Sequence, residues 1–184
     1  MKDFQNDVRL ARKGDTEAFS RLYSIVYKDM YHAALYNLRN QHDAYDIVSE
    51  AVIDAFSTIG KLKNEEAFKS WIMKILFAKI RKKQKEYYNK NLSDDDEDAI
   101  DKITFSEFDF ESSELKEALD NLDDESRGIL SLSVLGGYTS EEIAKIYGIK
   151  ASTIRSKLSR IKNELRLSLS LIHISEPTRL GMIS

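Results

Sequence analysis

The spacing of hydrophobic residues predicts helices along most of this chain. Apolar side chains return every three or four residues over residues 1–40, 43–59 and 65–88, and again from about residue 113 onward. That interval is the period of a helix with one buried face. Short glycine-containing breaks interrupt the pattern, for example at residues 60–64, because glycine disfavours helix interiors. The pattern predicts an all-α fold.

Residues 137–161 have the pattern of a helix-turn-helix. Thr139 and Glu142 have the spacing of a capping box at a helix start. Gly148 suits the left-handed conformation that ends a helix. A second helix is then predicted over residues 151–167, with apolar residues at intervals of four, three and four. The predicted buried stripe consists of Ile154, Leu158, Ile161 and Leu165.

The other faces of that second helix are rich in basic and hydroxylated residues. Arg and Lys reach phosphates or guanine edges, and Ser and Thr are short enough for close approach to DNA. This composition favours a recognition helix lying in a major groove. An ordinary amphipathic hairpin with a solvated basic face is the alternative. The candidate DNA contacts are Ser152, Thr153, Arg155, Ser156, Lys157, Ser159, Arg160 and Lys162.

Charge divides the chain into blocks. Residues 69–90 contain eight Lys or Arg and one Glu, a net of +7, whereas residues 92–114 contain ten Asp or Glu and one Lys, a net of −9. Residues 139–167 contain seven basic and three acidic residues, a net of +4. Self-repulsion keeps an acidic segment extended. We therefore expect two small helical domains joined by an acidic flexible linker, with the helix-turn-helix in the second. The expected boundaries are 1–88, 89–112 and 113–168.

Aromatic residues interleave with lysines in the helix predicted over residues 65–88. Lys and Arg follow phosphates, and an aromatic ring such as that of Trp71 stacks on an unpaired base for roughly 1–3 kcal/mol. This combination suits a strand-separated nucleic acid. The alternative places Trp71 in the core and leaves the lysines solvated.

An acidic stripe marks the preceding helix, predicted over residues 43–59. Asp46, Glu50 and Asp54 lie four residues apart, where like charges repel by a few tenths of a kcal/mol, roughly. The residues alone favour a solvated stripe, and the alternative is contact with a basic partner.

Composition excludes several classes of function. The 184 residues include no cysteine, which excludes disulfides, cysteine-based zinc sites and a thiol nucleophile. His32 and His42 have no neighbours at metal-ligand spacing, and no phosphate-binding glycine loop is present. We therefore expect no enzymatic activity, no metal and no cofactor. No apolar run reaches membrane-span length and the amino end lacks a signal-peptide core, so we expect a cytoplasmic protein without membrane insertion.

The final residues, 169–184, do not continue the stripe of the recognition helix. They include the only proline, Pro177. The segment resembles a translation of sequencing-adapter DNA, and we treat it as read-through rather than a functional tail. A genuine short tail is the alternative.

Several motifs together resemble the extracytoplasmic-function sigma factors of bacterial transcription, which belong to the sigma-70 superfamily. The resemblance covers roughly residues 4–167. The motifs occur in the family's order: GDTEAFSRLY, DAYDIVSEAVIDAF, FKSWIMKI, an acidic linker, LDDESRGIL and GYTSEEIAKIYGIKASTIRSKLSRI. The amino-terminal motifs combined with the helix-turn-helix are highly specific as a set.

The resemblance implies a role for each segment. The helix over residues 43–59 is similar to the surface that grips the clamp helices of RNA polymerase, which favours a partner for its acidic stripe. The implied polymerase-binding residues are Tyr45, Asp46, Ile47, Val48, Glu50 and Phe56. The next segment is similar to the part that opens the downstream (−10) promoter element. Its implied DNA contacts are Lys63, Asn64, Phe68, Lys69, Ser70, Trp71, Lys74, Lys79, Arg81 and Lys82. The recognition-helix face would bind the upstream (−35) element as duplex.

The implied partners are core RNA polymerase, through its clamp helices and flap, promoter DNA and, if the chain has one, an anti-sigma factor. We expect a monomer when the chain is free. Ser49 departs from the family at a position where glutamine is common, which bears on one polymerase contact. Two other functions remain open from the sequence. One is a stand-alone helix-turn-helix regulator that binds duplex DNA without polymerase, and the other is a helical adaptor that does not bind DNA.

Overall fold

The structure is a computed structural model that describes residues 2–91, 121–134 and 136–175. No strand occurs in these ranges, which agrees with the expected all-α fold. Residues 92–112 of the predicted acidic linker, and the start of the helix expected from about residue 113, fall outside them. In the same ranges, no helix is both long enough and apolar enough to cross a membrane.

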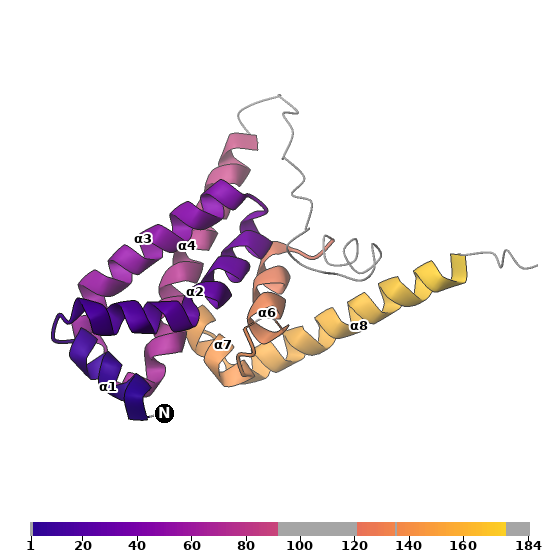
Figure 1. The fold of residues 1–184 in the computed structure, drawn as a ribbon. Helices are drawn as coiled ribbons and strands as arrows, with labels where there is room; N and C mark the ends of the chain where they lie inside the picture. Colours follow the sequence, from indigo (N-terminus) through magenta and orange to yellow (C-terminus); the bar gives the residue numbers. More distant parts are fainter. Residues whose placement is uncertain (1, 92–120, 135, 176–184) are drawn as a thin grey trace, which may run out of the picture.

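The amino-terminal helices form a bundle around the long helix α4 (Figure 1). α2, α3 and α4 pack against one another, and α1 packs against α2. Two short 3-10 turns, η1 and η2, connect α3 to α4. The bounds are α1 (Lys2–Ala11), α2 (Thr16–Leu38), α3 (Gln41–Thr58), η1 (Ile59–Lys61), η2 (Glu65–Ala67) and α4 (Phe68–Asn91).

Side-chain caps determine where α2 and α3 begin. Asp15 accepts a hydrogen bond from the Ala18 backbone N–H at 2.9 Å, and Asn40 accepts one from the Asp43 N–H at 3.0 Å. Both caps satisfy backbone donors that a helix start leaves unpaired. Between them, Arg39 takes a left-handed conformation at φ 53°, which ends α2 and turns the chain into α3.

The carboxy-terminal helices are α6 (Asp124–Val134), α7 (Ser140–Tyr147) and α8 (Ala151–Ser175). The predicted capping box is confirmed, because Thr139 and Glu142 bond reciprocally at the start of α7. Gly148 ends α7 at φ 71°, as its position predicted. Asp123 caps α6 by accepting a hydrogen bond from the Ser126 N–H at 2.9 Å.

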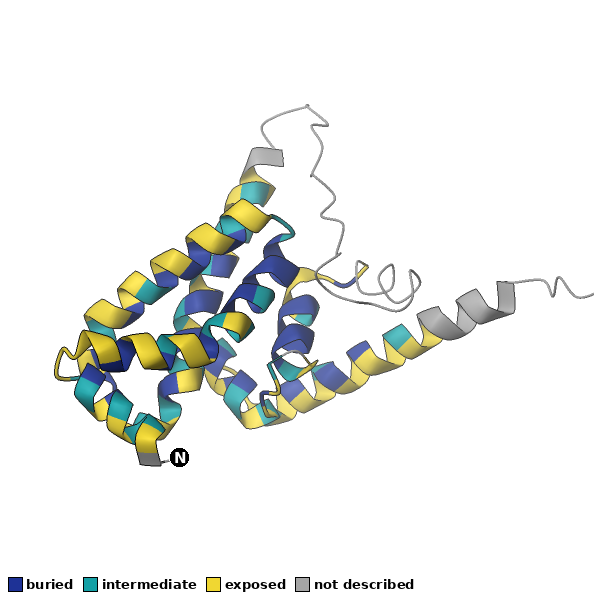
Figure 2. Cartoon of the chain, viewed as in Figure 1, coloured by how far each residue is buried: buried dark blue, intermediate teal, exposed yellow. Residues whose placement is uncertain are grey.

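Both sets of helices share one hydrophobic core. α4 packs on α2 and α3 and also on α7, and α2 packs on α6. Figure 2 shows the buried positions of α2, α4, α6 and α7 facing one another, whereas α8 is buried along one side only. The largest fully buried side chains come from both sets, among them Leu22, Phe68, Phe77, Ile129 and Ile143.

Two helices run further than the sequence pattern predicts. α4 continues to Asn91, three residues beyond the expected end, and α8 continues to Ser175 rather than ending near Leu167. The α8 backbone therefore extends into the segment assigned to read-through. Its strong helix formers, such as Leu169 and Leu171, explain why a helix continues there without the stripe.

Candidate nucleic-acid and polymerase interface

The helix α8 has the two-sided character that its sequence predicted. Ile154, Leu158 and Ile161 are buried and Leu165 is partly buried. Most of the candidate DNA contacts are exposed, namely Ser152, Thr153, Arg155, Ser156, Ser159, Arg160 and Lys162. The structure therefore presents a basic and hydroxylated surface on α8, packed from behind by α6 and α7.

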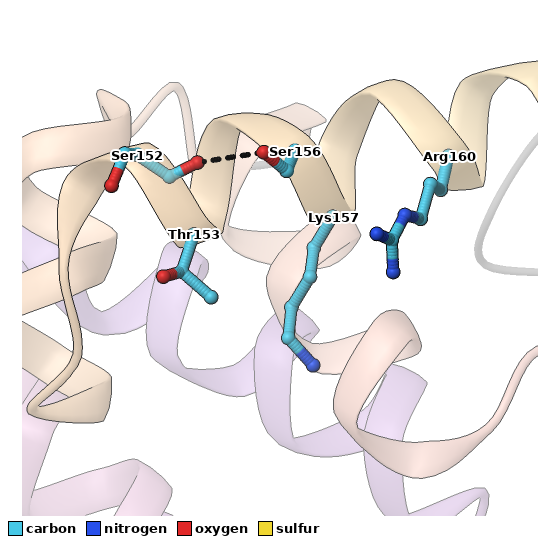
Figure 3. Close-up of a pocket in the computed structure, with 5 residues that line it drawn as sticks. All are labelled: Ser152, Thr153, Ser156, Lys157 and Arg160. Atoms are coloured by element: carbon cyan, nitrogen blue, oxygen red, sulfur yellow. Dashed lines mark hydrogen bonds between the residues drawn. The ribbon is translucent and has the colours of Figure 1, made fainter.

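Ser152, Thr153, Ser156, Lys157 and Arg160 line a shallow depression on α8 (Figure 3). Ser156 donates its hydroxyl hydrogen to the Ser152 carbonyl oxygen at 3.0 Å, so that hydroxyl lies close to the helix. Short polar side chains of this kind leave room for a DNA backbone to approach.

Two basic residues of α8 pair with acidic residues on neighbouring helices. Arg155 Nη1 lies 2.7 Å from Glu141 Oε1 on α7, and both side chains are more than half exposed. Lys157 Nζ lies 2.6 Å from Glu125 Oε2 on α6, and in Figure 3 its side chain extends away from Ser156. Arg155 therefore remains available at the surface, whereas Lys157 is turned toward α6.

The lysines of α4 are divided between two surroundings. Lys69, Lys74, Arg81 and Lys82 are exposed. Lys79 instead crosses to α3, with its Nζ 2.8 Å from Asp54 Oδ2 and 3.2 Å from Glu50 Oε2. These hydrogen bonds, first to Asp54 and then to Glu50, outweigh desolvation and raise the pKa of Lys79.

The aromatic residues at the start of α4 lie mainly in the core. Phe68 is fully buried, edge-on to Phe4 with ring centroids 5.8 Å apart, so its assignment as a −10 contact is corrected: this side chain packs inside. Trp71 is half-buried beside Phe68, at a centroid distance of 6.0 Å. Stacking on a base needs an open ring face, and of the two rings only Trp71 is partly open.

The remaining predicted −10 contacts lie around the η2 turn. Lys63 and Asn64 are exposed, and the Asn64 side chain accepts a hydrogen bond from the Glu66 N–H at 2.9 Å. Ser70 is half-buried and donates its hydroxyl hydrogen to the Ala67 carbonyl at 3.1 Å. Asn64 and Ser70 therefore stabilise the turn that leads into α4, and Lys63 lies free on the surface.

An exposed face of α3 combines acidic and apolar side chains. Asp46 and Glu50 are exposed, and Tyr45 and Phe56 are 49% and 41% exposed. Ile47 and Val48, also assigned to polymerase binding, are buried, and we correct both to core residues. They occupy the opposite side of the helix, which packs on α2 and α4.

One residue of this α3 face was missed from the sequence. Ile53 is 68% exposed, three residues before Phe56 and eight after Tyr45, which places it on their side of the helix. That spacing is the signal that would have identified it. We call Tyr45, Asp46, Glu50, Ile53 and Phe56 the α3 face.

The carboxy-terminal helices match a known protein family. Residues 112–165 match the family Sigma-70, region 4, a span that contains the whole of α6 and α7 and all four residues of the buried stripe of α8. The helix-turn-helix described above is therefore a region 4 module.

The curated relatives extend over both sets of helices. The chain is 31% identical to the RNA polymerase sigma factor SigV of Bacillus subtilis over 148 residues, which cover 78% of this chain and 86% of that protein. It is 26% identical to the ECF RNA polymerase sigma factor SigW of the same organism, over 88% of this chain and 94% of that protein. The chain belongs to the extracytoplasmic-function (ECF) RNA polymerase sigma factors.

Solved structures share the fold. The structure of CnrH in complex with the cytosolic domain of CnrY aligns with a TM-score of 0.68 at 16% identity, over 95% of this chain and 99% of that chain. The sigma factor RpoE from Bartonella quintana, in complex with the anti-sigma factor NepR, aligns with a TM-score of 0.65 at 23% identity, over 84% of this chain and 98% of that chain.

Proposed function

We propose that this chain binds core RNA polymerase and directs promoter-specific initiation, with α8 on the −35 duplex and α4 at the opened −10 element. The observation that carries the proposal is the exposed basic surface of α8, which lies within the region 4 helix-turn-helix of a chain that belongs to the sigma factors. The chain recruits the polymerase and positions it at the promoter, and the polymerase performs the catalysis.

On α8, the long and the short exposed side chains have different roles in DNA binding. Arg155 and Arg160 are long enough to reach guanine edges or phosphates, whereas Ser152 and Ser156 permit close approach of the backbone. Lys157 starts from its ion pair with Glu125. It would have to exchange that carboxylate for a phosphate. Arg155 would likewise have to leave Glu141, but its side chain is 57% exposed against 33% for Lys157, so the contribution of Lys157 to affinity should be the smaller.

The α3 face is the proposed contact with the polymerase clamp helices. Exposed large apolar residues such as Ile53 and Phe56 are unfavourable in water and mark protein interaction sites when they cluster. The adjacent carboxylates of Asp46 and Glu50 would add complementarity to a basic partner and speed the encounter. The flap of the polymerase is the proposed second contact, made by the carboxy-terminal helices.

On α4, exposed Lys69, Lys74 and Lys82 would follow the phosphates of the separated strand, with Trp71 as the available ring. Binding through such contacts weakens steeply as salt rises. Because the solved neighbours named above are complexes with CnrY and with the anti-sigma factor NepR, an anti-sigma factor is a proposed partner here as well.

Binding to core polymerase tests the proposal. The full chain should co-purify with bacterial core RNA polymerase as a stoichiometric complex, and this complex should protect a promoter fragment at two separated segments. If the chain does not bind polymerase but binds a duplex fragment tightly as a symmetric dimer, it is a stand-alone regulator. A chain that binds neither polymerase nor DNA would be an adaptor.

A further inference from the structure

The α3–α4 connection, residues 59–67, lies against the amino-terminal helix α1. Within it, η2 contacts both α1 and α4, and in Figure 1 α1 and the start of α4 occupy the same end of the molecule. Nearer to α3, a Cβ atom on Gly60 would lie 3.6 Å from the Arg12 carbonyl oxygen. α1 therefore flanks the connection on both sides of Lys63 and Asn64, two of the proposed −10 contacts.

Glu65 is the residue through which α1 holds the connection by charge. Arg12 Nη1 donates a hydrogen bond of 3.2 Å to Glu65 Oε1, and Arg9 Nε lies 3.8 Å from the same oxygen. The Arg12 and Glu65 side chains are 31% and 29% exposed, so salt screens this pair less than an open surface pair. Gln5 donates a longer hydrogen bond, 3.4 Å, to exposed Glu66. The Arg12–Glu65 pair is the shortest of these links.

Buried side chains anchor the connection on either side of its exposed residues. Leu62 is buried, and fully buried Phe68 packs edge-on against Phe4 of α1. Lys63 and Asn64 lie between these anchors and are exposed. Two exposed residues held at both ends by packed neighbours have a fixed place on the surface, which is the condition for a preformed binding site.

A preformed connection suits the capture of an unpaired base. Ordering a loop at the moment of binding lowers affinity, and a loop already in place avoids that loss. The Asn64 side-chain oxygen accepts the Glu66 N–H, which leaves the NH2 group of Asn64 as a donor to a base edge. A carboxylate beside such a site opposes a phosphate backbone, so the link to α1 accounts for the presence of Glu65.

We propose that α1 is a positioning element for the −10 site, and that the Arg12–Glu65 pair fixes the place of Lys63 and Asn64. The inference rests on the proposed function for its consequence, because the separated −10 strand is what Lys63 and Asn64 would bind. The link between α1 and the connection is itself a property of the free chain. Arg12 and Glu65 act through the connection and are positioning residues.

Amide hydrogen exchange in the free full chain measures the link without polymerase or DNA. The Leu62 N–H bonds to the Ile59 carbonyl and the Ala67 N–H to the Asn64 carbonyl, so exchange of these two amides reports opening of the connection. Glu65→Ala should speed their exchange by about three- to tenfold, the range expected for a coupled pair. Unchanged exchange at both amides would overturn the proposal.

Arg21→Gln is the matched control for a general loosening of α1. Arg21 Nη2 of α2 lies 2.6 Å from Asp7 Oδ1 of α1, so this variant removes an ion pair of α1 that does not involve the connection. It should leave exchange at Leu62 and Ala67 unchanged. If it speeds exchange there as much as Glu65→Ala does, α1 supports the fold alone and the proposal fails.

Reversal of the pair tests whether its two side chains act together. Arg12→Glu should open the connection further than Glu65→Ala, because it places two carboxylates side by side. The double variant Arg12→Glu, Glu65→Arg recreates an ion pair and should restore most of the original exchange rate. A double variant that exchanges as fast as Arg12→Glu alone would show that no such pair holds the connection.

Binding of single-stranded DNA in the presence of core polymerase tests the consequence. The probe is a pool of single strands of random sequence, from which the unmodified complex should enrich a preferred sequence. The measured quantity is the ratio of the affinities for the preferred sequence and for the pool. Removal of a carboxylate strengthens binding to any DNA by charge alone. Glu65→Ala should therefore bind the pool at least as tightly as before, whereas its ratio should fall by about three- to tenfold.

Glu66→Ala is the control of equal charge. It removes the neighbouring carboxylate, whose hydrogen bond from Gln5 is long at 3.4 Å, so affinity for the pool should rise in the same way and the ratio should stay constant. An unchanged ratio in Glu65→Ala would overturn the positioning role. If exchange responds as expected but the unmodified complex enriches no sequence, the link between α1 and the connection stands and the proposed function fails.

Discussion

Lys79 of α4 bridges to Asp54 of α3, with Nζ 2.8 Å from Oδ2. The residue thus joins the helix proposed to bind the −10 element to the helix that carries the α3 face. Lys79 is 20% exposed and also contacts Glu50 at 3.2 Å. A lysine engaged by two carboxylates is a poor phosphate ligand, because binding DNA would first require it to leave both.

The first prediction separates Lys79 from its exposed neighbour Lys82. Lys79→Met should lower the free energy of unfolding by about 0.2–1 kcal/mol, the usual range for a solvent-accessible ion pair, and should leave binding of single-stranded −10 DNA nearly unchanged. Lys82→Met should leave the free energy of unfolding nearly unchanged and should weaken binding of single-stranded −10 DNA. Chemical denaturation and fluorescence anisotropy measure the two effects, and equal losses of DNA binding in both variants would contradict this division.

The second prediction concerns the two paired cations of α8. Arg155→Ala should weaken binding to the −35 duplex by about 1–3 kcal/mol if its guanidinium contacts a base edge. Lys157→Ala should weaken it less and equally on all sequences, and should reduce the salt slope by about one. Titrations against promoter and scrambled duplexes at several salt concentrations measure both. A larger loss in Lys157→Ala would show that its ion pair with Glu125 does not persist.

The third prediction tests the α3 face. Ile53→Glu and Asp46→Arg should each weaken binding to core polymerase and leave the unfolding free energy within about 0.5 kcal/mol, because both side chains are exposed. Val48→Ala is the matched control, since this buried residue should lose roughly 1–3 kcal/mol of stability and keep its polymerase affinity while folded. Unchanged polymerase affinity in Ile53→Glu and Asp46→Arg would remove the clamp assignment.

The fourth prediction concerns the cap of α6. Burial alone raises the pKa of Asp123, but hydrogen bonds from the Ser126 backbone and hydroxyl outweigh it and hold this pKa below the ordinary value of 3.8. A carboxylate with a lowered pKa in the folded state stabilises above its unfolded pKa, and the contribution disappears as pH falls through the folded value. Asp123→Ala should therefore cost about 0.5–2 kcal/mol at pH 7 and much less below pH 3.

Asp123→Asn is the control for the charge of that cap. Asparagine caps a helix about as well as aspartate but does not titrate, so its unfolding free energy at pH 7 should be close to that of the unmodified chain. The difference between the two proteins should change only below about pH 4, where the aspartate takes up a proton. Urea titrations at pH 7, 4 and 3 provide the comparison.

Local signals predicted the local structure well. The capping box of Thr139 and Glu142 and the stop at Gly148 depend on residues within one or two helical turns, and the structure confirms them. Two helix ends were placed too early, at residues 88 and 167, because no capping residue marks either end and propensity alone carries the helix onward.

The errors among the candidate site residues have one cause. Ile47, Val48 and Phe68 were assigned by their place in a motif, and a motif identifies a segment without saying which of its side chains face outward. Reading the period of α3 separates them: Tyr45, Ile53 and Phe56 fall on one side and Ile47 and Val48 on the other. The buried hydrogen bond between Asn37 of α2 and Ser131 of α6 could not be predicted, since these residues lie 94 positions apart with no local pattern linking them.

The most direct test of the central claim is transcription. The full chain, core RNA polymerase and genomic fragments of the source organism would be combined, and the 5′ ends of the transcripts sequenced. The account predicts defined start sites that require both proteins and share an upstream and a downstream motif. Transcripts identical to those of core polymerase alone, from a chain shown to be folded, would contradict it.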